Sequence, residues 1–510
     1  MPKFLARFTD YLRSDKFYRL VIIVFILEAA WIAISAAYPQ AFDENFHFGL
    51  IKIYSHYWLP FISHQPPHAD AYGAVARDPS YLYHYLMSFP YRLVELFTKR
   101  QMAQVIILRF INIALFSWGI ILFRRLLIRV GASKALSNLI LMLFILIPIV
   151  PQLAAQINYD NLMIPLTALS LLLAFRLIDE IKAKKPSLWT ISLLSGLGFL
   201  TALVKYAYLP IFAGMVIFLL VYAFRTYRRS IRSFFRQLLR SWQSYSWIKR
   251  AFIAMAIVIP LGMFVQRDMV NLAVYHSIQP SCGKVLSVKQ CMAYSPWAYN
   301  YKNHAKLTAP GSNISLTNPL FYAFEWLYWM WYRLFFAVNG PGSNFRNYPP
   351  LPLPSAAALL LVIAGVIALI KWWRKIFSGN LRLMLLMSVT VAYLVALFAQ
   401  GYFTYRYTAV LENMNGRYLL PVLILAAVIF GQAISMALAN KQRRKAVFAL
   451  LALLFFLEGG GVITFIARSD PSWNIDNKAI VKVNNAARKV VKNVVVKGKK
   501  SYSTRVWFFN

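Results

Sequence analysis

The sequence contains few charged residues and very few acidic ones. Only 14% of its 510 residues are charged and only 17 are Asp or Glu, whereas 59% are apolar. A soluble domain is about one quarter charged, so this composition excludes a disordered chain and a collagen-like fibre. Two cysteines are too few for a small disulfide scaffold, a zinc cluster or a redox relay.

The apolar residues are gathered in runs of about twenty, the length that crosses a hydrocarbon core of roughly 30 Å. The sequence therefore predicts an all-α polytopic membrane protein with about eleven transmembrane helices and large extracytoplasmic loops. The predicted spans are residues 18–38, 102–123, 136–156, 161–178, 188–204, 207–224, 251–266, 353–370, 383–400, 418–438 and 446–467.

The basic residues indicate an orientation. The net charge is +38, and if the N-terminus is cytoplasmic, the six inner segments carry 29 Lys and Arg residues while three short outer loops carry 3. Cytoplasmic loops carry such an excess, so the charge does not indicate a nucleic-acid partner. This predicts a multi-pass protein of the cell (plasma) membrane with a cytoplasmic N-terminus and an extracytoplasmic active site.

Three long segments fall on the outer side in this topology. We expect residues 1–467 to form one transmembrane module, with its active-site face built from outer loops 39–101 and 267–352. Residues 468–510 are expected to be a basic extracytoplasmic tail. The aromatic run 321–336 is interrupted by Glu325 and Arg333, which favours an interfacial or re-entrant helix.

The first outer loop begins with two adjacent carboxylates, Asp43 and Glu44. A carboxylate can act as a general base or hold a divalent metal. His47 follows Asp43 by four residues and shares its face if a helix begins here. The alternative is that Asp43 caps a helix over 44–57. Tyr81 and His84 lie later in the loop, on a helix predicted over 80–97, and with His47 they are candidates for a loop that contacts donor or acceptor. The alternative for this helix is an interfacial anchor.

Further polar residues stand at the outer ends of other spans. Asp160 is either an N-cap or a second acid facing Asp43. Lys205 is an isolated lysine at membrane depth, which marks a functional site unless its side chain snorkels to the headgroups. Arg417 begins a span and suits a phosphate, with Glu412 as an alternative partner. Gly416 would let a ligand approach the backbone.

The sequence leaves three further questions open, which concern a disulfide, an ion pair and a metal site. Cys282 and Cys291 lie nine residues apart in the second outer loop, where an oxidising compartment favours a disulfide over two free thiols. Glu28 and Arg109 lie within spans and could pair with each other. The sequence leaves a metal requirement open, and Asp43 and Asp160 are the candidate ligands if the protein uses a divalent cation such as Mg²⁺ or Mn²⁺.

Four segments together resemble the GT-C superfamily of membrane glycosyltransferases. They are Asp43–Glu44 after the first span, DPSYLYHYL in the first loop, GLGFLTALVKYAYLP (196–210) and NGRYLLP (415–421), in the family's order. They look closest to bacterial members of unassigned substrate and to protein O-mannosyltransferase-like members. The sequence differs from the best-known members in its TALVKY stretch and in its basic tail, which leaves the donor open.

The resemblance implies an inverting glycosyltransferase that takes a sugar from a polyprenyl- or dolichyl-phosphate donor. Asp43 or Glu44 would be the base or metal ligand, and Lys205 and Arg417 would hold the lipid phosphate. The acceptor would be a hydroxyl of a cell-envelope glycan, lipid or protein. The alternative is a transporter or flippase of a polar lipid or glycolipid. Transporters typically show inverted repeats and mid-membrane polar residues, and the sequence shows no such repeat.

Overall fold

The computed structural model describes residues 3–338, 340, 351–412, 414–439 and 441–495. Apart from one isolated bridge between Ala36 and Asn474, these residues contain no β-structure. Nine helical segments among them are long and apolar enough to cross a membrane, so the chain is an all-α polytopic membrane protein. These segments are built on α2 (Asp15–Ser35), α5 (Gln101–Arg129), α8 (Asp160–Lys182), α10 (Leu209–Tyr227), α12 (Trp247–Phe264), α18 (Pro352–Phe377), α19 (Leu381–Thr408), α20 (Leu420–Ala437) and α21 (Gln442–Gly459).

The remaining helices are shorter or lie outside these segments. Two of them, α6 (Lys134–Ile145) and α9 (Leu188–Val204), are apolar. The others are α1 (Lys3–Arg13), α3 (Glu44–Tyr54), α4 (Leu82–Phe97), α7 (Ile149–Ala154), α11 (Ile231–Gln243), α13 (Val270–Tyr275), α14 (Cys282–Val285), α15 (Val288–Cys291), α16 (Ser295–Thr308), α17 (Pro319–Leu334), α22 (Gly461–Arg468) and α23 (Lys478–Val495). Single turns are η1 (Asp70–Tyr72), η2 (Val75–Arg77), η3 (Tyr206–Tyr208), η4 (Val265–Met269), η5 (Gly416–Leu419) and η6 (Pro471–Trp473).

The eleven predicted spans correspond to these nine segments and the two shorter apolar helices. The prediction of one continuous helix over 136–156 is wrong, because the chain breaks between α6 and α7. Pro148 lies at this break, and proline disfavours helical geometry in the residue before it. The helix predicted over 44–57 likewise ends earlier, at Tyr54.

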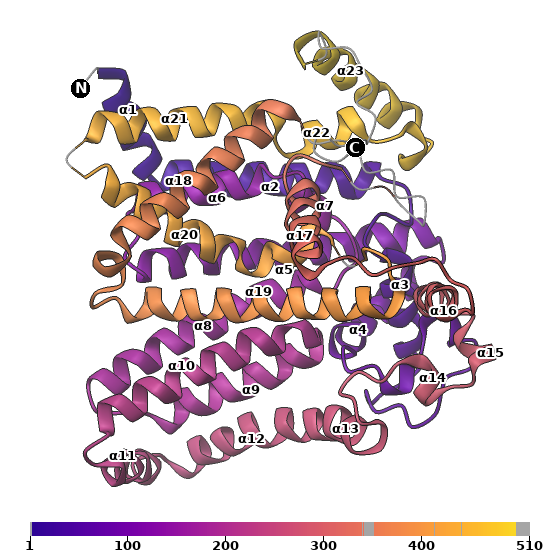
Figure 1. Cartoon of the computed structure of the whole chain (residues 1–510), viewed down its shortest axis with the longest axis horizontal. Helices are drawn as coiled ribbons and strands as arrows, with labels where there is room; N and C mark the ends of the chain where they lie inside the picture. The colour runs from indigo at the N-terminus through magenta and orange to yellow at the C-terminus, as the bar shows by residue number, and fades with distance from the viewer. Residues whose placement is uncertain (1–2, 339, 341–350, 413, 440, 496–510) are drawn as a thin grey trace.

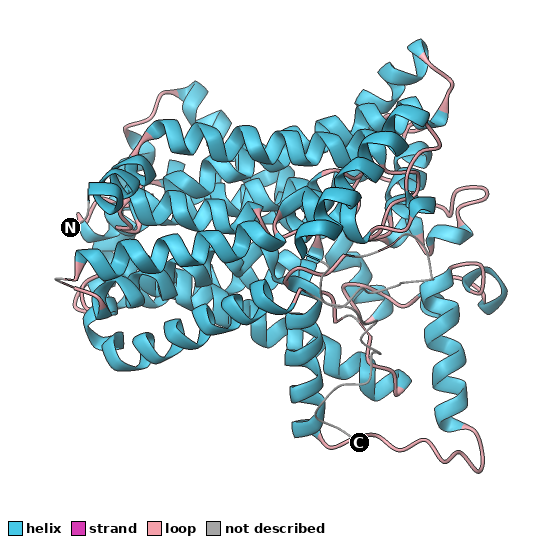
Figure 2. Cartoon of the chain, turned by 90° about the horizontal axis from the view of Figure 1, so that it is seen from above, coloured by secondary structure: helices cyan, strands magenta, loops and turns pink. Residues whose placement is uncertain are grey.

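The long helices run side by side, and the connections at the two ends of the bundle differ (Figure 1). The end with α1 and α11 has short, basic turns, whereas α3, α4 and α14–α16 lie together at the opposite end. Most loop segments gather at that second end, opposite the N-terminus (Figure 2). We call it the loop end. Helix α23 also lies there, opposite α1, and residues 496–510 of the predicted tail lie outside the described residues.

The second large loop is held by a disulfide and by a close contact between α17 and η5. Cys282 and Cys291 form a disulfide between α14 and α15, with their Cα atoms 5.7 Å apart. Helix α17 covers most of the aromatic run 321–336 and runs at a steep angle to the long helices (Figure 1). A Cβ atom on Gly416 would collide with the backbone of Leu334 at the end of α17. Gly416 therefore permits close packing of η5 against α17, and the expectation that a ligand approaches this backbone is wrong.

Candidate functional site

Arg417 and Asp43 form an ion pair at the loop end. Arg417 Nη2 donates a 2.9 Å hydrogen bond to Asp43 Oδ2. Arg417 lies in η5, where Asn415 Oδ1 accepts from its backbone N–H and fixes the turn. The guanidinium is 8% exposed, whereas the Asp43 side chain is 58% exposed. The pair thus joins a buried cation to a carboxylate that faces solvent, and Glu412 is not the partner.

Asp43 has an unusual backbone for its position. It occupies the N-cap of α3 with φ +66° and ψ 32°, in the left-handed region, and its side chain makes no capping hydrogen bond. Left-handed geometry at a non-glycine residue costs of order 1–3 kcal/mol and is concentrated at functional sites. The interpretation of Asp43 as a side-chain N-cap is therefore wrong, because the carboxylate is directed to Arg417.

Lys205 and Asp160 form the second ion pair. Lys205 Nζ lies 2.6 Å from Asp160 Oδ1, and both side chains are buried. Lys205 connects α9 to η3, and Asp160 is the first residue of α8. The snorkelling alternative for Lys205 and the N-cap alternative for Asp160 are both wrong. Lys205 does not snorkel, because it is buried against Asp160, and Asn158 Oδ1 accepts from the N–H of Asp160 in place of a capping aspartate.

Two tyrosines link the ion pairs. Lys205 Nζ lies 4.5 Å from the ring centroid of Tyr159 and 5.3 Å from that of Tyr418. Arg417 Cζ lies 5.0 Å from the same Tyr418 ring. A cation within about 6 Å of an aromatic face is attracted by the ring quadrupole. Both cations therefore share one aromatic wall, and the residues predicted from three distant parts of the chain meet in one cluster.

Arg417 keeps unused hydrogen-bonding capacity. Its Nε and Nη1 are buried and have no hydrogen-bond partner within the part of the chain that the structure describes. Asp160 Oδ2 is in the same condition. A buried guanidinium N–H without a partner is costly, and a guanidinium fork matches the geometry of phosphate oxygens. The cluster therefore has the chemistry of an anion site beside an exposed carboxylate.

Glu44 occupies a different environment from its neighbour Asp43. Both of its oxygens accept from Arg109, at 2.8 Å from Nε and 2.7 Å from Nη2. They also accept from the backbone N–H groups of Gln40 and Ile157. Glu44 and Arg109 are fully buried. Arg109 therefore does not pair with Glu28, which the sequence had left possible. Both oxygens of Glu44 already accept two hydrogen bonds each, so Glu44 stabilises the loop that carries Asp43.

His47 and His84 form a buried pair that contacts Tyr159. His47 Nδ1 lies 2.9 Å from His84 Nε2, and the His47 ring packs on Tyr159 with centroids 4.5 Å apart. Burial lowers the pKa of His47 well below 6.5, with further contributions from His84, Arg417 and Lys205. Burial also lowers the pKa of His84 to about 3. The pair is therefore neutral at ordinary pH, and the His47 ring packs against Tyr159.

Tyr81 lies outside this cluster. It is fully buried, and its ring faces Arg267, whose Cζ lies 4.4 Å from the ring centroid. Arg267 in turn donates to the backbone carbonyl of Asp78. Tyr81 therefore belongs to the packing between the first and second large loops, and the structure does not bring it to the ion pairs.

The cluster does not fit a divalent-cation site. Among the described residues there is no group of three or more His, Cys, Asp and Glu side chains placed to hold a metal. The two candidate ligands, Asp43 and Asp160, each face a buried cation, Arg417 and Lys205. A divalent ion at either carboxylate would be repelled by the neighbouring positive charge.

Sequence reasoning missed the two aromatic residues that join the cluster, Tyr159 and Tyr418. Each directly neighbours a residue it had singled out, Asp160 and Arg417. This adjacency was the available signal, because an aromatic ring beside a buried cation is a common contact.

No protein-family model matches this sequence, and no curated protein matches it.

Proposed function

We propose that this protein is an integral-membrane glycosyltransferase that uses a polyprenyl-phosphate-linked sugar. The observation that carries the proposal is the pair of unused, buried N–H positions on Arg417, beside the exposed carboxylate of Asp43. A lipid-linked sugar phosphate needs both features at the end of membrane-spanning helices. The resemblance of the four sequence segments to GT-C enzymes supports the same function.

The location of the cluster suits a substrate with a lipid tail. Arg417 is the second residue of the apolar segment Gly416–Ala437, and Lys205 precedes the segment Tyr206–Tyr227. A phosphate at these residues would lie at the membrane surface, with the isoprenoid tail in lipid and the sugar toward the loops. The basic turns at the opposite end of the bundle favour a cytoplasmic position for that end. The proposed active site would then face the outside of the cell membrane.

The proposed reaction is a direct displacement at the anomeric carbon. The acceptor hydroxyl loses its proton to Asp43 as its oxygen forms a bond to that carbon. The bond between the carbon and the phosphate oxygen breaks, and its electron pair leaves with the polyprenyl phosphate. Arg417 Nε and Nη1 hold the phosphate and stabilise its increasing negative charge, while Lys205 contributes a second positive charge. This displacement inverts the anomeric configuration.

Asp43 and Arg417 can perform these roles together. Arg417 uses only Nη2 for Asp43, so the phosphate can engage the other two nitrogens without breaking the ion pair. The pair would hold the Asp43 carboxylate beside the bound phosphate, where the acceptor hydroxyl must approach the sugar.

Purified protein in lipid nanodiscs tests the proposal. The probes are tritiated short-chain polyprenyl-phosphate hexoses, with an envelope extract from cells lacking the protein as the acceptor fraction. We expect tritium to enter a new glycosidic linkage with at least one donor. Movement of intact donor across proteoliposomes, without any new linkage, would instead establish the transporter alternative. Arg417→Ala should abolish transfer, whereas Arg443→Ala, an exposed arginine at the basic end, should not.

A further inference from the structure

A long apolar groove lies away from the ion-pair cluster. It has a volume of about 430 Å³ and lies between α1, α6, α18, α20 and α21. Leu423 and Ser435 both line it from α20, so it extends about 18 Å along that helix at 1.5 Å per residue. This length is a large part of a hydrocarbon core of roughly 30 Å.

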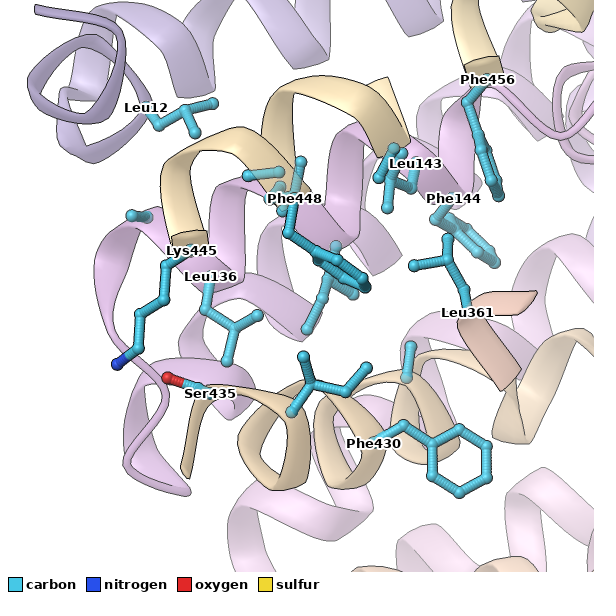
Figure 3. A pocket seen from close by; sticks show the side chains of 18 of the residues that line it. Leu12, Leu136, Leu143, Phe144, Leu361, Phe430, Ser435, Lys445, Phe448 and Phe456 are labelled. Atoms are coloured by element: carbon cyan, nitrogen blue, oxygen red, sulfur yellow. The ribbon is translucent and has the colours of Figure 1, made fainter. Parts of the chain in front are cut away.

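The two ends of the groove differ in chemistry. Figure 3 shows Lys445 and Ser435 together at one end, and Phe456, Phe144 and Leu361 toward the other. Arg13 lines the groove where α1 ends. The walls between the ends are aliphatic and aromatic, as Leu136, Leu143 and Phe430 illustrate. The polar end is the basic end of the bundle, where α1 ends and α21 begins.

An apolar groove of this kind in a bilayer fills with hydrocarbon. Its apolar walls offer water too few hydrogen-bond partners, and a void would forfeit the dispersion contacts of every side chain that lines it. One acyl chain satisfies the walls. Arg13 and Lys445 then provide positive charge where the headgroup of that lipid would lie, and basic side chains at the membrane surface attract an anionic headgroup.

We infer that this groove binds an anionic phospholipid of the leaflet at the basic end, with one acyl chain along α20 and its phosphate beside Arg13 and Lys445. The inference goes beyond the proposed glycosyltransferase activity. The phosphate of a sugar donor would bind Arg417, which precedes α20, whereas this headgroup site lies where α20 ends and α21 begins. The site would tie α1, α20 and α21 together through lipid.

Thermal unfolding of delipidated protein in detergent tests the site. The added probes are phosphatidylglycerol, phosphatidylcholine with the same acyl chains, and a short-chain polyprenyl phosphate. We expect phosphatidylglycerol to raise the unfolding midpoint at lower concentration than phosphatidylcholine does. Arg13→Ala/Lys445→Ala should raise its half-saturating concentration by about thirtyfold. Arg443→Ala/Arg444→Ala removes two exposed charges outside the groove lining and should leave it unchanged.

A second variant tests the groove itself. Ala427 lines it, so Ala427→Phe should abolish the phosphatidylglycerol effect, whereas Leu360→Phe on the exposed face of α18 should not. Equal stabilisation by both phospholipids, or equal losses in the two double variants, would overturn the inference. Stronger competition by polyprenyl phosphate in wild type, retained in Arg417→Ala, would assign the groove to an isoprenoid tail and also overturn it.

Discussion

Arg417 donates a hydrogen bond to Asp43 across a sequence separation of 374 residues. This contact joins the turn before α20 to the loop after α2. It brings an exposed carboxylate beside a guanidinium that still has two unused nitrogens. The proposed chemistry depends on this juxtaposition, because a general base and a phosphate-binding cation must both reach one bound sugar phosphate.

Glu44 is expected to be essential for folding rather than for proton transfer. Glu44→Gln would leave the buried Arg109 without its counter-charge, and breaking a buried ion pair costs about 3–5 kcal/mol. We expect a large drop in the thermal unfolding midpoint. The control is Glu95→Gln, which breaks an exposed pair with Lys99 and should cost less than about 1 kcal/mol. A stable but inactive Glu44→Gln protein would contradict this role.

The Lys205–Asp160 pair predicts non-additive stability. Lys205→Met or Asp160→Leu alone leaves one buried, uncompensated charge and should destabilise the protein by about 3–5 kcal/mol. The double variant removes both charges and should recover much of that loss, as measured by thermal unfolding in a double-mutant cycle. Activity should remain low in the double variant, because the second phosphate-binding cation is gone. Additive losses would show that the two groups do not interact.

The buried histidines predict weaker stability in acid. Their pKa values are lowered in the folded protein, so below about pH 6.5 the unfolded chain binds more protons than the folded one. Stability should fall as the pH decreases from 6.5, by about 1.4 kcal/mol per pH unit for each histidine. The double variant His47→Gln/His84→Gln should reduce the change in the thermal unfolding midpoint between pH 7 and pH 5. The exposed control His64→Gln should leave this pH dependence unchanged. An unchanged pH dependence in the double variant would show that the two histidines do not cause the loss of stability in acid.

Gly416 predicts a packing requirement beside Arg417. In Gly416→Ala the new methyl group would meet the backbone of Leu334, which cannot move as a side chain can. Overpacking of this kind costs about 1–3 kcal/mol, and it should also displace Arg417 and weaken donor use. Gly262→Ala is the matched control, since nothing lies within 4 Å of its added Cβ atom. Equal unfolding midpoints in the two variants would contradict the close contact.

The membrane architecture was predictable from the sequence because length and hydropathy determine which helices can cross a bilayer. The location of the polar residues at span ends was also visible, and the structure brings Asp43, Lys205, Asp160 and Arg417 into one cluster. Their partners were not predictable. Arg109 had two available acids, Glu28 and Glu44. The tertiary structure decides between them, because the carbonyl oxygens at the end of α2 hold the Arg109 guanidinium beside Glu44.

Local rules failed where long-range contacts were stronger. Asp43 and Asp160 both stand where capping residues usually stand, yet each carboxylate is used by a distant cation. A capping hydrogen bond contributes about 1 kcal/mol, which is less than the cost of leaving a buried cation unpaired. Such competition depends on the tertiary structure and leaves no trace in the local sequence.

The activity of Asp43→Asn tests the central claim most directly. Asparagine keeps the size and one side-chain oxygen but removes the charge and the basicity. With polyprenyl-phosphate hexose as donor, we expect turnover to fall by at least about a hundredfold while donor binding is retained. The unfolding midpoint should also fall, because the buried Arg417 loses its counter-charge. Asp10→Asn, an exposed aspartate in α1, should behave as wild type. Full transfer activity in Asp43→Asn would contradict the account.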